Sequence, residues 1–166
     1  DTVSHLRMLH AAGYAVLALD ARGHGQSSGQ TNALGWQGVA DVRGAVRFLR
    51  RQAGVDPGRI AAVGLSMGAE EALRAAAAGV PLAAVVADGA GASTSGDRDL
   101  AAERGLLAPV SRSVGWLAIR ETELVSGVRE PAPLRDVVSR IRIPVLLIAS
   151  HAPGERTIDA RRYPSW

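Results

Sequence analysis

One stretch of this sequence, residues 60–70, constrains the fold more than any other. It reads Ile-Ala-Ala-Val-Gly-Leu-Ser-Met-Gly-Ala-Glu: an apolar run, a serine between two glycines, and then an alanine-rich helical pattern. The apolar run predicts a buried strand, and the segment after Ser66 predicts a helix that runs to Gly79. Gly64 and Gly68 are expected where a Cβ would crowd the reversal from strand to helix. The stretch therefore predicts a tight strand–turn–helix unit with Ser66 at its apex.

Ser66 in such a turn is a candidate nucleophile. The turn holds the serine in a strained, outward-pointing conformation at the carboxyl end of a parallel strand. Its hydroxyl then lies at a helix N-terminus, where the aligned peptide dipoles favour developing negative charge. The structural alternative is a buried N-cap, whose hydroxyl accepts a bond from a backbone N–H of the helix.

The composition is that of one globular domain. The chain has 166 residues, of which 47% are apolar and 21% charged, with no repeat or linker, so residues 1–166 are predicted to form a single domain. No apolar run is long enough to span a membrane and no signal peptide is visible, so we expect a cytoplasmic protein. The chain begins at Asp1 rather than Met, and we expect it to be part of a longer polypeptide. It has no cysteine, which excludes disulfides and thiolate chemistry.

The high isoelectric point does not indicate a nucleic-acid partner. The sequence pI is about 10.5, but the net charge is only +3, and all 19 basic residues are arginines. These arginines are interleaved with Asp and Glu, and aromatic residues make up only 4% of the chain. Binding to a phosphate backbone requires a clustered basic stripe, which this pattern lacks.

Apolar runs alternate with helical patterns along the chain. This alternation predicts an α/β fold, a mostly parallel sheet of about four strands with helices on both faces. Residues 92–130 are expected to form short helices in a cap between strands. The expected strands are Tyr14–Leu19, Ile60–Leu65, Leu82–Ala87 and Pro144–Ala149. The expected helices are residues 1–12, 35–52, 67–79 and 133–140.

The helix after Ser66 is expected to pack through small residues. Gly68, Ala69 and Ala72 allow a close approach to the sheet. Glu70 and Arg74 have the spacing of an i,i+4 ion pair, which we expect on the exposed side of the helix.

Four motifs resemble those of the α/β-hydrolase family, and together they extend over most of the chain. They are Asp-Ala-Arg-Gly-His-Gly-Gln-Ser at 20–27, Asp-Pro-Gly-Arg-Ile at 56–60, Gly-Leu-Ser-Met-Gly at 64–68 and Pro-Val-Leu-Leu-Ile at 144–148. The resemblance implies a partial α/β-hydrolase fold. It also implies a serine hydrolase that acts on a small-molecule acyl substrate, an ester, thioester or peptide.

The resemblance implies a role for several residues. Ser66 would attack the acyl carbon to form an acyl-enzyme, and the backbone N–H of Met67 would stabilise the oxyanion. Asp20, Arg22 and His24 would order the loop that they occupy. The second oxyanion donor of the family would precede residue 1. No metal or organic cofactor is implied.

Three carboxylates are candidates for the acid of a catalytic triad. Glu155 follows the strand that precedes the acid in most of the family, and we favour it slightly. Asp159 is the second choice in the same loop. Asp88 follows the preceding strand, where some members of the family carry the acid.

The general base of the triad is not found in this sequence. The family places its histidine after the acid and beyond one more strand. The histidines here are His5 and His10 on the first expected helix, His24 in the loop at 20–27, and His151 before the favoured acid. We therefore expect a fragment that is incomplete at both ends, and we expect it to be poorly soluble or molten by itself.

Three other functions can be weighed against the same residues, and only the first fits them. A protein of this fold that lacks the base would be a non-catalytic binding module. A dinucleotide-binding domain would need Gly-x-Gly-x-x-Gly after its first strand, and the loop at Arg22–Gly29 lacks that spacing. A phosphate-binding P-loop needs a lysine, and the chain has none.

Overall fold

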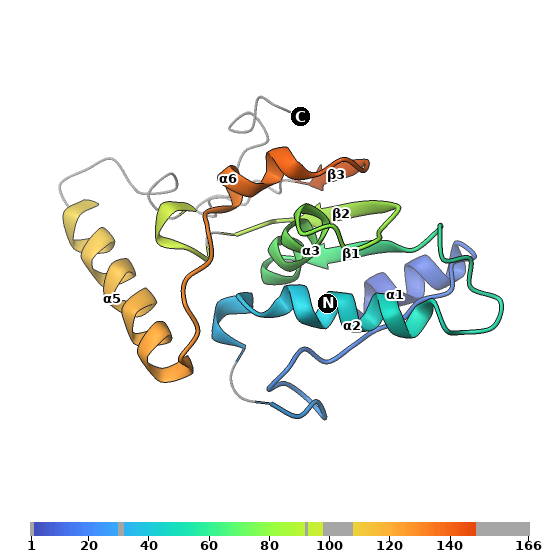
Figure 1. Cartoon of the computed structure of the whole chain (residues 1–166), viewed down its shortest axis with the longest axis horizontal. Coiled ribbons are helices and arrows are strands. Elements are labelled where there is room, and N and C mark those ends of the chain that lie inside the picture. The colour runs from blue at the N-terminus through green and yellow to red at the C-terminus, as the bar shows by residue number, and fades with distance from the viewer. Residues whose placement is uncertain (1, 30–31, 92, 98–107, 149–166) are drawn as a thin grey trace.

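The chain forms an α/β unit around a small parallel sheet (Figure 1). The computed structural model describes residues 2–29, 32–91, 93–97 and 108–148. Within these ranges the sheet has three strands, in the spatial order β1-β2-β3. The strands are β1 (Ala61–Leu65), β2 (Ala84–Asp88) and β3 (Val145–Ile148).

The register of the sheet brings the carboxyl ends of its strands to one edge. Leu65 pairs with Asp88, and Asp88 pairs with Ile148, in two parallel ladders. The loops that leave these three strands therefore start side by side, as expected for parallel strands joined by helical crossovers.

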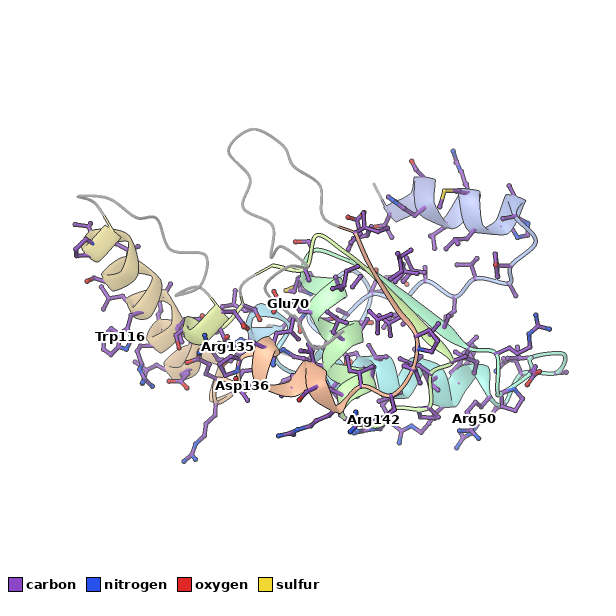
Figure 2. All side chains as sticks on the ribbon, turned by 90° about the horizontal axis from the view of Figure 1, so that it is seen from above. Arg50, Glu70, Trp116, Arg135, Asp136 and Arg142 are labelled. Atoms are coloured by element: carbon purple, nitrogen blue, oxygen red, sulfur yellow. The ribbon has the colours of Figure 1, made fainter. Side chains whose placement is uncertain are left out.

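Helices connect and flank the strands. They are α1 (Thr2–Ala11), η1 (Ala33–Gly35), α2 (Gly38–Leu49), α3 (Met67–Ala77), α5 (Ala108–Ser126), α6 (Leu134–Val137) and η2 (Val138–Arg140). In Figure 2, α1 lies on the opposite side of the strands from α2 and α3. None of the residues of α1 is buried, so the far face of the sheet has little cover from it.

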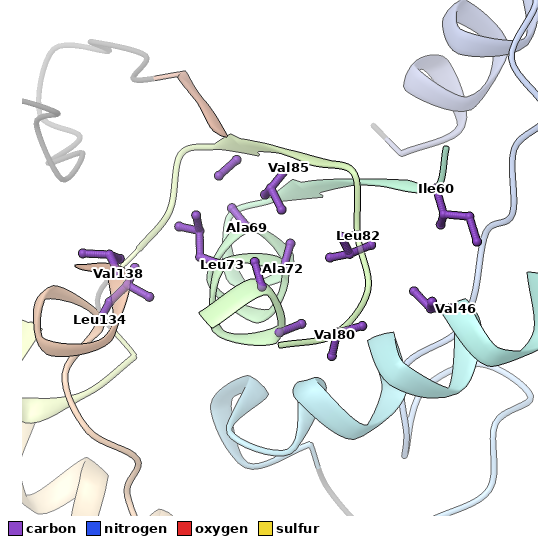
Figure 3. Close-up of a cluster of buried hydrophobic side chains, with 13 residues drawn as sticks. Val46, Ile60, Ala69, Ala72, Leu73, Val80, Leu82, Val85, Leu134 and Val138 are labelled. Atoms are coloured by element: carbon purple, nitrogen blue, oxygen red, sulfur yellow. The ribbon is translucent and has the colours of Figure 1, made fainter. Parts of the chain in front are cut away.

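The core lies between the sheet and α3 (Figure 3). Alanines dominate this side of α3, and their small side chains let the helix backbone come close to β1 and β2. Leu73 fills the space between α3 and Val85 of β2, while Leu134 and Val138 close the core from α6 and η2. Burial of this apolar surface is the main stabilising term of the unit.

The first of the four expected strands does not form. Tyr14–Leu19 is neither strand nor helix, and no strand pairs with it in the described part of the chain. Tyr14 is 64% exposed and Leu19 is 50% exposed. The prediction of a strand buried on both faces was wrong because an apolar run needs a neighbour to share its hydrogen bonds, and β1 has only β2 beside it here.

The described part of the expected cap region contains helical residues at 95–97 and the long helix α5, which is longer than the short helices expected there. α5 stands apart from the sheet in Figure 1 and packs through Ile119 against Ala33 and Trp36. The Trp36 indole N–H donates to the Ser93 carbonyl at 3.0 Å, which joins η1 to the segment after β2. That residues 92–130 act as a cap stays a prediction.

Candidate active site

Ser66 occupies a strained turn between β1 and α3. Its φ is +52° and its ψ is −118°, a conformation that costs a non-glycine residue about 1–3 kcal/mol. Its side chain is exposed and makes no capping hydrogen bond to α3. The buried N-cap alternative is therefore excluded, because the hydroxyl is neither buried nor used to satisfy the helix.

Close packing of the backbone explains one of the two glycines beside Ser66. A Cβ on Gly64 would lie 2.1 Å from the carbonyl oxygen of Gly68, so only glycine fits there. A Cβ on Gly68 would meet no atom within 4 Å outside its own helix and chain neighbours. The expected crowding is thus confirmed for Gly64 and wrong for Gly68, whose backbone supplies the close contact.

Backbone hydrogen bonds hold the turn from both sides. The Ser66 N–H donates to the Asp88 carbonyl at 2.8 Å, and the Ser66 carbonyl accepts from the Ala69 N–H at 3.0 Å. The N–H of Met67, the first residue of α3, has no hydrogen-bond partner among the described residues. It is one of the free donors that every helix N-terminus presents.

Only one of the three candidate acids can be placed. Asp88 ends β2, and its main chain bonds directly to the serine turn. Asp88 is half-buried at the sheet edge where the serine turn begins. Glu155 and Asp159 lie outside the described residues, as does His151.

The described histidines are not bonded to Ser66. His24 is exposed in the loop at 20–27, and its Nδ1 lies 3.1 Å from the Arg22 carbonyl oxygen. His5 and His10 lie on α1. Within the ranges that the structure covers, the Ser66 hydroxyl has no hydrogen-bond partner at all.

The loop at 20–27 is folded around Asp20. One Asp20 carboxylate oxygen accepts from the Gln26 N–H at 3.1 Å, and the Ser27 hydroxyl donates to the Asp20 carbonyl at 2.7 Å. A Cβ on Gly25, whose φ is +52°, would lie 2.1 Å from that carboxylate. These contacts give the loop a defined shape without burying it.

Arg22 anchors the loop to α2. Its guanidinium donates to the Asp41 carboxylate through Nε at 3.0 Å and Nη2 at 2.7 Å, and Nη1 donates to the Gln37 side chain. Burial of Asp41 opposes ionisation, but the hydrogen bonds and charge of Arg22 outweigh it, so the pKa of Asp41 is lowered. Sequence reasoning missed Asp41, since a single carboxylate on a helix carries no motif.

Glu71 fills the space between α2 and α3. A Cβ on Gly35 or Gly38 would collide with its side chain, so these glycines make room for it. The Asn32 amide donates to Glu71 at 3.2 Å, while burial raises the pKa of Glu71. Asn32 is itself buried, and its Oδ1 has no partner among the residues that the structure describes. The glycines at the start of α2 were the only signal for this contact in the sequence.

The expected surface pair of α3 is instead part of a buried polar cluster. Glu70 is 3% exposed and Arg74 is 6% exposed, and they face Asp97, which is fully buried. The prediction of an exposed pair was wrong because the segments at 93–97 and 130–134 fold over this side of α3. In Figure 2, Glu70 lies among the helices, whereas Arg50 and Trp116 project from the surface.

The described residues show neither a metal-binding cluster nor a membrane-spanning helix. No three His, Asp or Glu side chains are grouped there in a way that could hold a metal ion. No described helix is both long enough and apolar enough to cross a membrane.

Known proteins resemble this chain over its sequence and its fold. An uncharacterized protein of Mycobacterium tuberculosis, found in strains H37Rv and CDC 1551, is 41% identical over 78 residues, which are 47% of this chain and 27% of that protein. Two crystal forms of the Pyrococcus furiosus esterase Pf2001 match at TM-scores of 0.58 and 0.59, with 28% and 26% identity. Each match covers 86% of this chain and 52% of the esterase, so the chain spans about half of that enzyme's length.

A family profile agrees with this likeness. The profile of the X-Pro dipeptidyl-peptidase family, S15, matches residues 1–152, which include the serine turn and all three strands. The resemblance to α/β-hydrolases in the sequence motifs is confirmed by the structural match to the esterase. This chain belongs to the X-Pro dipeptidyl-peptidase (S15) family, and its parallel sheet and flanking helices are a partial α/β-hydrolase fold.

Proposed function

We propose that this chain carries the nucleophile of a serine hydrolase, and that Ser66 forms an acyl-enzyme. The Ser66 oxygen attacks the acyl carbon of an ester, thioester or peptide, and the alcohol, thiol or amine leaves with a proton. Water then attacks the acyl-enzyme, which releases the carboxylic acid and restores the serine hydroxyl.

The backbone conformation of Ser66 is the observation that carries this proposal. A φ of +52° stores strain that no helix capping or burial of the side chain requires. Strain of this kind persists where the surrounding structure imposes it, and it is concentrated at functional sites. Here Gly64 and the bond from Ser66 to Asp88 impose it, and the result is an exposed hydroxyl at a helix N-terminus.

The free N–H of Met67 supports its assignment as an oxyanion donor. Donors that already point toward the developing charge need no reorganisation during the reaction, and removing one such donor typically costs a factor of about 10²–10³ in kcat. The donor belongs to the backbone, so side-chain substitutions at Met67 would test only the shape of the site.

Asp88 is the acid candidate that the described geometry supports. It lies at the same sheet edge as Ser66 and contacts the serine turn through its main chain. Glu155 and Asp159 remain alternatives. A general base must accept the Ser66 proton, and the base is proposed to be a histidine, either His151 or a histidine of a longer polypeptide.

The family and the structural relatives suggest which substrates to try. The family is named for release of dipeptides from X-Pro peptides, and the Pyrococcus relative is an esterase. We propose that the substrate is a small acyl compound of one of these classes. A chromogenic acyl ester and a chromogenic X-Pro dipeptide amide distinguish them directly.

A fluorophosphonate probe tests the nucleophile. The wild-type protein, as this chain or within a longer polypeptide that supplies the base, is expected to be labelled. Ser66→Ala is expected to abolish labelling and to reduce turnover by about 10³-fold or more. Ser113→Ala is the matched control, because Ser113 is an exposed serine on α5 and should leave labelling unchanged.

The outcome also separates the enzyme from the binding module. Labelling that survives Ser66→Ala would show that another residue reacts. A folded protein that is never labelled, whether as this chain or within a longer polypeptide, would favour the non-catalytic module.

A further inference from the structure

Three buried ionisable side chains form a cluster that begins one helical turn after the proposed nucleophile and has no part in its chemistry. They are Glu70, Arg74 and Asp97. Burying charges is costly unless each one is paired and hydrogen-bonded. A cluster of this kind one helical turn from Ser66 therefore needs an explanation.

Asp97 and Arg74 satisfy each other and the surrounding backbone. The Asp97 carboxylate accepts from the Thr94 hydroxyl at 2.7 Å and from the Leu134 N–H at 2.9 Å. Arg74 lies 3.5 Å from that carboxylate and donates to the Ala132 carbonyl at 2.5 Å. These bonds connect α3, the segment at 93–97 and the start of α6, and they use both terminal nitrogens of Arg74.

Glu70 has a hydrogen-bond partner besides its ion pair with Arg74. Its carboxylate lies 3.9 Å from Arg74, beyond hydrogen-bond distance, and it accepts a hydrogen bond from the Ser93 hydroxyl. A Cβ on Gly91 would lie 3.2 Å from the other carboxylate oxygen, so the chain passes close over Glu70 at this point. Burial is the main cause that raises the pKa of Glu70, and Asp97 adds to it.

Glu70 thus touches both sides of the proposed site. Its N–H approaches the Ser66 carbonyl at 3.4 Å, and its side chain holds Ser93. The segment that it holds starts at Asp88, whose carbonyl accepts from Ser66.

We infer that Glu70 is a positioning residue that fastens the segment after Asp88 onto the helix of the nucleophile, through the hydroxyl of Ser93. It keeps Asp88 and the serine turn in one relative position during the reaction. This inference rests on the proposed function of Ser66, since a position has catalytic value only if the serine reacts.

Two variants of Glu70 test the inference. Glu70→Ala removes the acceptor, whereas Glu70→Gln keeps an oxygen that can accept from Ser93. Fluorophosphonate titration of active sites, followed by kinetics on a chromogenic acyl ester, gives kcat for each titrated site. We expect Glu70→Ala to lower kcat per site by about 10-fold to 100-fold with a small change in KM, because a displacement of about 1 Å is enough for such a loss. Glu70→Gln should stay within about 3-fold of the wild type, since it keeps the acceptor.

A merely structural role would give another result. It would lower the number of titrated sites and leave kcat per site unchanged, which would overturn the inference. Glu121→Ala on the exposed face of α5 is the control and should change neither quantity.

Ser93→Ala completes a double-mutant cycle. If Glu70 acts through Ser93, the double variant should be no slower than Glu70→Ala alone. Additive losses would contradict that path.

Failure of the proposed function can be told apart from failure of this inference. If the wild type is not labelled, hydrogen exchange of the amides at 89–97 still tests the fastening. Glu70→Ala should then speed their exchange, and unchanged exchange would show that Glu70 does not hold this segment.

Discussion

Ile60–Leu65 and Tyr14–Leu19 are two apolar runs of similar length, and each precedes a loop that contains glycine and polar residues. The first run supplies β1, which pairs with β2 and is covered by α3. The second is an exposed segment without regular secondary structure, and it has no partner strand in the described part of the chain. Apolar composition is therefore not enough to make a strand, which also needs a neighbour for its hydrogen bonds and a helix to cover it.

The loops that follow these runs are held in different ways. The serine turn is held by its own backbone, through the contact of Gly64 with Gly68 and the bond from Ser66 to Asp88. The loop at 20–27 is held by side chains, with Arg22 bonded to Asp41 on α2. Backbone packing fixes a strained conformation tightly, whereas a partly exposed ion pair is sensitive to pH and to salt.

The largest expected effect contrasts a buried leucine that packs against the sheet with an exposed leucine of Tyr14–Leu19. Leu73→Ala empties a space in the fully buried contact between α3 and the sheet, and we expect it to lower the free energy of unfolding by about 2–5 kcal/mol. Leu19→Ala is the matched variant in the exposed run and should cost less than about 0.5 kcal/mol. Urea denaturation of both variants measures the difference. Equal losses would mean that Tyr14–Leu19 is as well buried in solution as the contact between α3 and the sheet.

The next effect concerns the serine turn. Gly64→Ala places a Cβ against the Gly68 backbone, which cannot move without shifting α3, and we expect a loss of about 1–3 kcal/mol or more. Gly44→Ala, within α2, meets no atom within 4 Å and should stabilise the protein by about 0.5–1 kcal/mol. Thermal unfolding compares the two alanines. A neutral Gly64→Ala would show that the turn can relax.

The smallest effect tests the ion pair of the other loop. Asp41→Asn removes the charge that Arg22 holds, and we expect a loss of about 1–2 kcal/mol at neutral pH. Because the pKa of Asp41 is lowered in the fold, the pair stabilises the protein above the unfolded pKa of about 3.9, and this contribution is lost as the pH falls through the lower folded value.

The pH dependence supplies its own control. The difference between Asp41→Asn and the wild type should shrink in acid and also decrease at high salt. A difference that stays constant from pH 7 into strong acid would show that Asp41 acts through packing rather than through its charge.

Much of the site region could be predicted from local sequence. The strand, turn and helix around Ser66 follow from an apolar run, two glycines and an alanine-rich segment, and the structure has all three. The pair Glu70 and Arg74 was correctly placed on one helix but on the wrong side of it. Helical spacing predicts which side chains are neighbours on a helix. It does not predict which other segments cover them when both faces of the helix are packed.

The sequence by itself determined the α/β class and the position of Ser66. The steric conflict at Gly64 arises within five residues and is the same wherever the unit is placed. Tertiary structure alone decided that Tyr14–Leu19 pairs with no described strand, that Asp41 holds the loop at 20–27, and that Glu70 faces Ser93. Arg22 and Asp41 are 19 residues apart in the sequence, and Glu70 and Ser93 are 23 residues apart. The environment of these side chains therefore exists only after the chain has folded.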